Sequence, residues 1–310
     1  MQHTFKLFLS VFLFLVSSTC FPQATAPANP ANSAEDPNRA KEVLQALAAA
    51  YPDLIGDVRY LPAANGKPAD WSLLLRGVRF YYAKGCLLPD NLRLQADDYS
   101  PLPFYNYSGK LPPWQDPSPE EEARWKQYSQ NRLGGKPIKR SSIFLDTLWH
   151  SSSRATSYEM QKTIMFLGRK TLVHYYIMEE LALVETRIRK IAETNPEVSA
   201  WLKAVSTTTS WNWRDIAATQ SRSYHSYGVA LDILPKSIQG KQTYWLWTAE
   251  KNPRWWAVPY KERYTPPQEV IDAFAAYGFI WGGVWPVYDT MHFEYRPELL
   301  ILSGHTINKF

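Results

Sequence analysis

SYHSYGVALD at residues 223–232 and WGGVWPVYDTMHFE at residues 281–294 are the two stretches that decide the fold of this 310-residue chain. In the first stretch, His225 lies in a polar segment and Gly228 permits a tight turn. A short apolar run follows, with Asp232 inside it. A carboxylate in a buried strand is costly unless a partner compensates its charge. The partner could be a metal ion or a buried Arg or Lys, and the pattern leaves these two alternatives open.

The second stretch places another polar side chain between apolar neighbours. His292 lies between Met291 and Phe293, and in an extended strand these neighbours point away from it while Glu294 shares its side. Asp289 stands three residues earlier. Two neutral imidazoles and one carboxylate form a common zinc site with a fourth position open for water. A nearby free carboxylate can then take the proton from that water.

The joint pattern distinguishes these residues from the other histidines. A single histidine in a chain of this length is more often a hydrogen-bonded core or surface residue than a ligand, and we interpret His150, His174 and His305 in that way. Together, S-x-H-x-x-G-x-A-x-D and a later D-x-x-H-x-E are far more specific than either half alone.

These motifs resemble the VanY-like family of D-alanyl-D-alanine carboxypeptidases and phage L-alanyl-D-glutamate endopeptidases. The core of that family contains S-x-H-x-x-G-x-A-x-D, a downstream W-G-G-x-W, and D-x-x-H-F-E. The matching residues in this chain are Ser223, His225, Gly228, Ala230, Asp232, Trp281, Gly282, Gly283, Trp285, Asp289, His292, Phe293 and Glu294. The resemblance extends over residues 170–298 and does not cover the first half of the chain.

The resemblance implies a role for each motif residue. His225, Asp232 and His292 match the ligands of a Zn²⁺ cofactor. Asp289 matches the catalytic carboxylate, which would activate the water and later protonate the leaving amine. A W-R-x-I motif upstream includes Arg214, the candidate for holding the scissile carbonyl oxygen as negative charge develops on it.

Other residues near the motifs have two interpretations each. Ser223 either hydrogen-bonds the substrate or braces the site, and Glu294 would orient His292 without binding the metal. Trp281 and Trp285 either form walls of the substrate cleft or pack in the core.

The N-terminus predicts export. Residues 7–16 read LFLSVFLFLV, a run that is short for a membrane span but typical of a signal peptide, and an A-x-A cleavage site follows. We therefore predict a signal peptide at residues 1–26, a flexible leader at residues 27–38, and a periplasmic or cell-envelope location. Lipidation of Cys20, which would tether the protein to a membrane, is an alternative, although Thr19 replaces the small residue that usually precedes such a cysteine.

Composition and periodicity describe the rest of the chain. The net charge of +5 is mild, no nucleic-acid-binding motif is present, and export argues against such a partner. If Cys20 is removed, Cys86 is the remaining cysteine and no internal disulfide can form.

The rest of the chain has three kinds of segment. Residues 89–119 are Pro-rich and are predicted to be irregular, and residues 239–264 are rich in Trp and have no assigned role. The patterns predict helices at residues 39–50, 120–130, 170–193 and 197–205, and one or two strands at residues 71–82.

We therefore predict an α+β fold in which a small antiparallel sheet bears a zinc site and has flanking helices. The peptidase domain is predicted at residues 151–310, after an N-terminal aromatic- and Pro-rich region at residues 39–150. The predicted function is zinc-dependent hydrolysis of amide bonds in peptidoglycan stem peptides, by a carboxypeptidase or an endopeptidase. The residues of W-G-G-x-W and D-x-x-H-F-E, with Asp as the base, slightly favour the endopeptidase. The alternative is a non-catalytic, zinc-stabilised envelope module that binds peptidoglycan or a partner.

Overall fold

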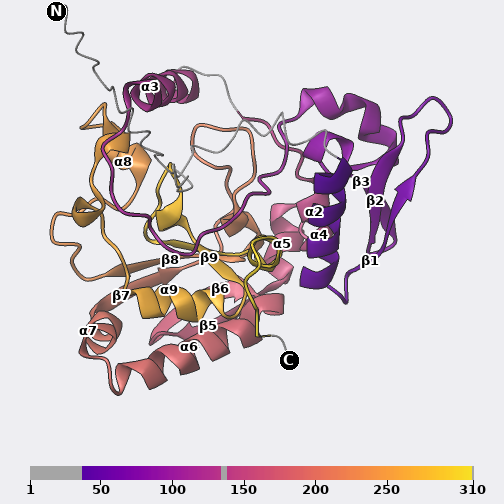
Figure 1. Cartoon of the computed structure of the whole chain (residues 1–310). Helices are drawn as coiled ribbons and strands as arrows, with labels where there is room; N and C mark the ends of the chain where they lie inside the picture. Colours follow the sequence, from indigo (N-terminus) through magenta and orange to yellow (C-terminus); the bar gives the residue numbers. More distant parts are fainter. Residues whose placement is uncertain (1–36, 134–137, 309–310) are drawn as a thin grey trace, which may run out of the picture.

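The computed structural model describes residues 37–133 and 138–308, which form an α+β fold with three antiparallel sheets (Figure 1). The predicted signal peptide at residues 1–26, including Cys20, lies outside the described residues, and so does most of the predicted leader. Within the two described ranges, no helix has both the length and the apolar character needed to cross a membrane.

The central sheet contains both motif stretches. Its strands are β7 (Val205–Thr209), β8 (Ala230–Pro235), β10 (His292–Tyr295) and β9 (Phe279–Trp281), in that spatial order and all antiparallel. The register of β8 and β10 places Asp232 directly opposite His292. The predicted small antiparallel sheet is therefore confirmed, and strand pairing alone brings together two residues that are 60 positions apart.

The two faces of this sheet have different chemistry. Leu231, Ile233 and Phe293 point to one face and are buried in the main core. There, the ring of Phe293 stacks on Phe274 of α9 (Gln268–Ala275), with ring centroids 4.0 Å apart. The helix α6 (Met178–Ala192) packs against α9, and α7 (Pro196–Ala204) packs against α6. The alternation of side chains leaves the polar motif residues on the other face.

The prediction of a helix over residues 170–193 was wrong at its N-terminal end. The predicted apolar stripe does bury Leu181, Val184 and Ile188 of α6. Residues Arg169–His174, however, form the strand β6, which pairs with β5 (Gln161–Phe166) in a hairpin. Gly168 makes the turn with a φ of +77°. In β6, Thr171 and Val173 are buried and Leu172 between them is only partly buried, which follows the two-residue period of a strand; His174, the last residue of the strand, is buried as well.

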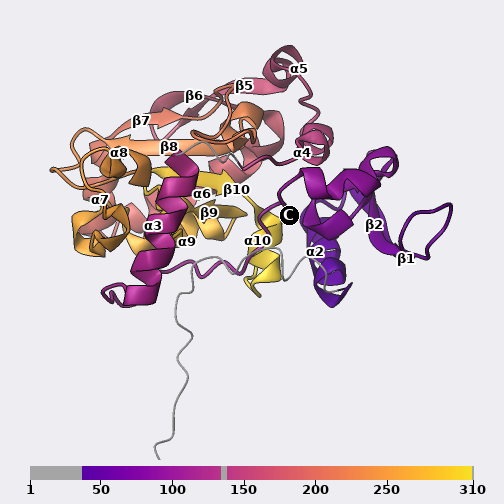
Figure 2. The same ribbon diagram turned by 90° about the horizontal axis from the view of Figure 1, so that it is seen from above.

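The N-terminal region has a sheet of its own, formed by β1 (Ile55–Leu61), β2 (Asp70–Leu75), β3 (Val78–Tyr81) and β4 (Leu88–Pro89) in sequential order. Residues 71–82 therefore contain two strands, as predicted. The helix α2 (Pro37–Ala50) packs against this sheet and against α10 (Pro297–Leu302), and Figure 2 shows α10 between α2 and β9. The main core includes residues from both sides of position 150, and the domain boundary there stays a prediction.

The remaining segments lie outside the three sheets. The predicted irregular stretch after residue 89 begins with a 3₁₀ segment and then runs without regular structure to residue 118. In the Trp-rich segment, Trp245, Trp255 and Trp256 are buried in a small core of their own, whereas Trp247 is exposed. The other helices and 3₁₀ turns are α3 (Pro119–Leu133), α4 (Ile143–Leu148), α5 (Arg154–Glu159), α8 (Trp245–Ala249), η1 (Ala83–Gly85), η2 (Asp90–Asp98), η3 (Tyr175–Ile177), η4 (Tyr224–Tyr227), η5 (Trp255–Ala257), η6 (Tyr260–Glu262) and η7 (Gly282–Val284).

Candidate metal centre

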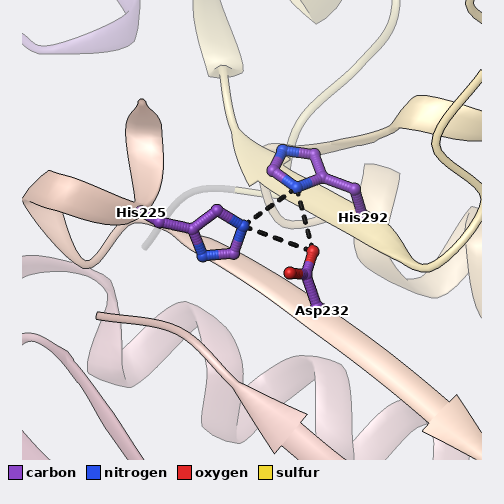
Figure 3. A group of neighbouring side chains, drawn as sticks. All are labelled: His225, Asp232 and His292. Atoms are coloured by element: carbon purple, nitrogen blue, oxygen red, sulfur yellow. Dashed lines mark hydrogen bonds and ion pairs between the residues drawn. The ribbon is translucent and has the colours of Figure 1, made fainter. Parts of the chain in front are cut away.

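Three side chains from the two motifs converge on one point (Figure 3). Nε2 of His225 lies 3.1 Å from Nδ1 of His292, and Oδ1 of Asp232 lies 3.1 Å from the same Nδ1 and 3.2 Å from the same Nε2. Ligand bonds of about 2.0–2.1 Å in a tetrahedral zinc site separate the ligand atoms by roughly 3.3 Å. The triangle therefore has the size that three ligands around a single zinc ion require.

A short turn holds His225 in place. Ser223 caps the turn η4, because its Oγ accepts a hydrogen bond from the backbone N–H of His225. Gly228 ends the turn with a φ of +71°, and a Cβ at that position would lie 1.9 Å from Oε1 of Gln161. Nδ1 of His225 lies 2.7 Å from the carbonyl of Ser210, to which it can only donate. That bond leaves the Nε2 lone pair directed at the cluster.

His292 has the complementary arrangement. Its Nε2 lies 3.1 Å from Oε2 of Glu294, which leaves Nδ1 facing Asp232. Carboxylates and carbonyls that bind the outer nitrogen of a histidine ligand fix its tautomer and ring orientation. Both rings of the cluster therefore present an unprotonated nitrogen when their outer nitrogens carry the proton.

The charges of the cluster favour a cation. Burial would raise the pKa of Asp232, but His225 and His292 lower it below its usual range. Burial would lower the pKa of His292, but the carboxylates of Asp232 and Glu294 raise it to about 10. Two imidazole nitrogens and a carboxylate oxygen are also the donor set that zinc prefers. The residues present thus fit a Zn²⁺ ion.

Asp289 is a half-buried residue beside the cluster. Burial is the main reason that its pKa rises to about 7; Asp232 and Glu294 raise it further, while His292 and Arg214 partly offset the rise. Its Oδ1 is buried and has no hydrogen-bond partner among the described residues. An unpaired buried carboxylate oxygen is costly, and such groups are concentrated at functional sites.

The two glycines before Asp289 set its backbone. The N–H of Asp289 donates to the carbonyl of Gly282 at 3.0 Å. A Cβ on Gly283 would lie 2.0 Å from the ring of Trp281. That ring is 1% exposed, and its Nε1–H donates to the carbonyl of Thr290 at 2.8 Å. Of the two interpretations of Trp281, the structure supports core packing, because a fully buried ring has no surface to offer a substrate.

Trp285 lies differently. It is half-buried, and its ring centroid is 5.4 Å from that of His292. Its Nε1–H donates to the hydroxyl of Tyr105 at 2.6 Å. Trp285 therefore borders the metal centre and is itself held by a residue of the N-terminal region.

Arg214 and Ser223 are adjacent in space. The backbone N–H of Ser223 donates to the backbone carbonyl of Arg214. The backbone N–H of Arg214 donates to Oγ of Ser226. The Arg214 side chain is exposed, and its charge lowers the pKa of Asp289. Because the Ser223 hydroxyl caps η4, the structure supports its bracing role.

Three groups support the site although no motif includes them. The carbonyl of Ser210 carries no signal, because any residue has one. Tyr105 lies in the irregular stretch, where no pattern points to Trp285. Arg296, which binds Glu294, could have been found from the sequence. His292, Glu294 and Arg296 are ionisable residues at every second position along β10 and just beyond its end, so they share one side of an extended chain.

Comparisons with known proteins cover two parts of the chain. Residues 217–295, about a quarter of the chain, match an M15 peptidase family model described as D-alanyl-D-alanine carboxypeptidase. Residues 43–104 match a model described as a domain of unknown function, DUF8518. Searches of curated proteins and of solved structures found no match. The first match includes all three residues of the cluster and Asp289, and it supports a peptidase of the M15 family.

Proposed function

We propose that the protein is a zinc-dependent peptidase that hydrolyses amide bonds in peptidoglycan stem peptides. The observation that carries the proposal is the triangle formed by His225, Asp232 and His292, with Asp289 beside it, whose Oδ1 is buried and has no hydrogen-bond partner among the described residues. A site that serves only to stabilise the fold would need the three ligands but not the fourth group. The match to a family described as D-alanyl-D-alanine carboxypeptidase supports a stem-peptide substrate.

Asp289 is suited to proton transfer. A zinc ion held at the cluster would supply hydroxide near neutral pH and polarise a carbonyl. Asp289 would accept the proton that the attacking water loses and then donate it to the leaving amine. A general base works best when its pKa is near the working pH, and burial raises the pKa of Asp289 toward neutrality before a cation binds.

Arg214 would stabilise the developing negative charge. Its guanidinium group is exposed and acts electrostatically on Asp289. An oxyanion beside Asp289 would therefore meet a fixed positive charge. Trp285, next to His292, would form one wall for the substrate.

We further propose that the protein is exported and acts in the periplasm or cell envelope, where stem peptides are found. Carboxypeptidase cleavage would remove one terminal residue, whereas endopeptidase cleavage would split the stem. The masses of the products identify the bond.

The direct test uses the purified mature protein and defined muropeptides. We expect cleavage that a chelator abolishes and that added zinc restores, with products read by mass spectrometry. Zinc bound at one equivalent without turnover would contradict the peptidase and support the non-catalytic envelope module. Cleavage that persists after complete removal of metal would contradict the zinc mechanism.

A further inference from the structure

A row of buried, ionisable side chains extends from the metal centre toward the N-terminal region. Oε2 of Glu294 binds Nε2 of His292 at 3.1 Å, and its Oε1 accepts from Nη1 of Arg296 at 3.2 Å. Nε of Arg296 donates in turn to Oε1 of Glu298. The charges alternate in sign along the row, so each group is compensated by its neighbours.

The row is almost completely shielded from solvent. Glu294, Arg296 and Glu298 are 6%, 2% and 3% exposed. Removing one partner of a buried charge pair leaves the other uncompensated, which is strongly destabilising, although such pairs add little stability over an apolar core. A role in holding another group is therefore a better explanation for these residues than stability alone.

Arg296 is held in three directions. Besides its two carboxylate partners, Nη2 donates to the carbonyl of Pro103 at 3.1 Å. The guanidinium group also lies 4.9 Å from the ring centroid of Tyr224, the residue before His225. The planar fork of arginine can make these bonds at fixed angles, whereas a lysine ammonium cannot.

The N-terminal region supplies the far end of the row. The hydroxyl of Tyr51, which directly follows α2, donates to Oε2 of Glu298 at 2.9 Å. The same region provides the Pro103 carbonyl, and Tyr105 holds Trp285 against His292. Tyr51, Pro103 and Tyr105 thus hold groups that contact His292 directly or through the row. All three lie outside residues 217–295, the part of the chain that matches the peptidase family.

We propose that Arg296 is a positioning residue of the metal centre, and that residues 51–105, most of which match a domain of unknown function, complete that centre by anchoring Arg296, Glu298 and Trp285. The inference rests on the proposed zinc site. Arg296 acts by fixing Glu294, and Glu294 in turn holds the His292 ring with Nδ1 toward the metal. The N-terminal region is then a working part of the peptidase and not a separate binding module.

The test compares zinc affinity with stability in the full mature chain. Partners of this kind typically change metal affinity or activity by about 10- to 100-fold when substituted. We expect Arg296→Lys to weaken zinc binding roughly 10-fold, measured by competition with a chromophoric chelator, and Tyr51→Phe to weaken it by a smaller factor. Tyr264→Phe is the matched control, because it removes another buried hydroxyl, the acceptor of a 2.8 Å bond from Trp201 that involves no residue of the row.

Thermal unfolding of the zinc-free variants separates positioning from folding. All three variants are expected to lose some stability, but only Arg296→Lys and Tyr51→Phe should lose zinc affinity. Equal zinc affinity in the wild type and these two variants would overturn the inference. Should Arg296→Lys not fold, Tyr51→Phe alone decides the matter in the same way. A wild type that binds no zinc would instead refute the proposed function, so the two failures are distinguishable.

Discussion

Asp289 is the residue on which the proposed chemistry depends, since its Oδ1 is buried beside the cluster and has no hydrogen-bond partner in the described parts of the chain. We predict that Asp289→Asn lowers kcat by roughly 10²- to 10⁴-fold, because an amide cannot accept the proton. Zinc content should stay near one equivalent, because the side chain is not one of the three converging ligands. Muropeptide hydrolysis and metal analysis of the same sample measure both quantities.

An exposed aspartate far from the centre provides the control for this substitution. Asp98 lies at the end of η2 and is exposed, so Asp98→Asn should leave both activity and zinc content unchanged. Wild-type turnover in Asp289→Asn would show that another group takes the proton.

Single residues could be predicted where a motif fixes their spacing. His225, Asp232 and His292 follow from the motif, and the two-residue strand period also placed Glu294 beside His292. The Ser210 carbonyl could not be predicted, because a backbone acceptor leaves no trace in the sequence and depends on how β7 ends.

In the W-G-G-x-W motif, the second glycine, Gly283, cannot be replaced by a larger residue without moving Trp281. Gly283→Ala would place a Cβ 2.0 Å from the buried ring of Trp281. Overpacking of a core of this kind usually costs about 1–3 kcal/mol, so we predict a loss of this size in the free energy of unfolding, measured by urea denaturation. The shift of Trp281 should also lower peptidase activity.

Gly56→Ala is the matched control at the scale of an element. Gly56 lies in β1, and a Cβ there meets nothing within 4 Å. We expect a change within about 0.5 kcal/mol, as for other surface substitutions. A Gly283→Ala variant as stable as Gly56→Ala would mean that Trp281 can move without cost, contrary to its packing.

Elements could be predicted where one period dominates. The stripe of α6 is unambiguous from Ile177 onward, whereas the preceding residues Arg169–His174 carry apolar residues at too few positions to distinguish helix from strand. Their strand character depends on pairing with β5, a contact made possible by the turn at Gly168. Pairing partners decide such short segments, and local propensity does not.

At the scale of the whole molecule, His174 joins segments on both sides of residue 150. Its Nε2–H donates to the carbonyl of Trp149 at 3.0 Å, and its Nδ1 accepts from the N–H of Tyr176. Burial is the main reason that the pKa of His174 falls to about 4. An unfolded chain protonates this histidine near pH 6.5, so the unfolded state binds more protons between about pH 6.5 and 4.

The stability of the fold should therefore fall as the pH drops through that window. Between pH 7 and pH 5, His174 alone accounts for a loss of about 2 kcal/mol. Urea denaturation in the presence of chelator measures this loss, and His174→Gln should show a pH dependence smaller by that amount. His150→Asn removes only one of the lesser causes of the lowered His174 pKa, so it should change the pH dependence much less than His174→Gln does. Identical pH profiles for the wild type and His174→Gln would contradict the prediction.

Contacts between the two halves of the chain were beyond prediction. Tyr51 and Glu298 are 247 positions apart, and no motif of the sequence includes both or indicates that they are in contact. Only the packing of α2 against α10 brings them together, and that packing depends on the whole core.

An anomalous-difference map from crystals of the mature protein grown with zinc would show whether His225, Asp232 and His292 hold the metal, if data are collected on both sides of the zinc absorption edge. We expect one peak about 2.0–2.1 Å from Nε2 of His225, Oδ1 of Asp232 and Nδ1 of His292. Zinc bound elsewhere, or no peak among these three atoms in a protein that cleaves its substrate, would contradict it.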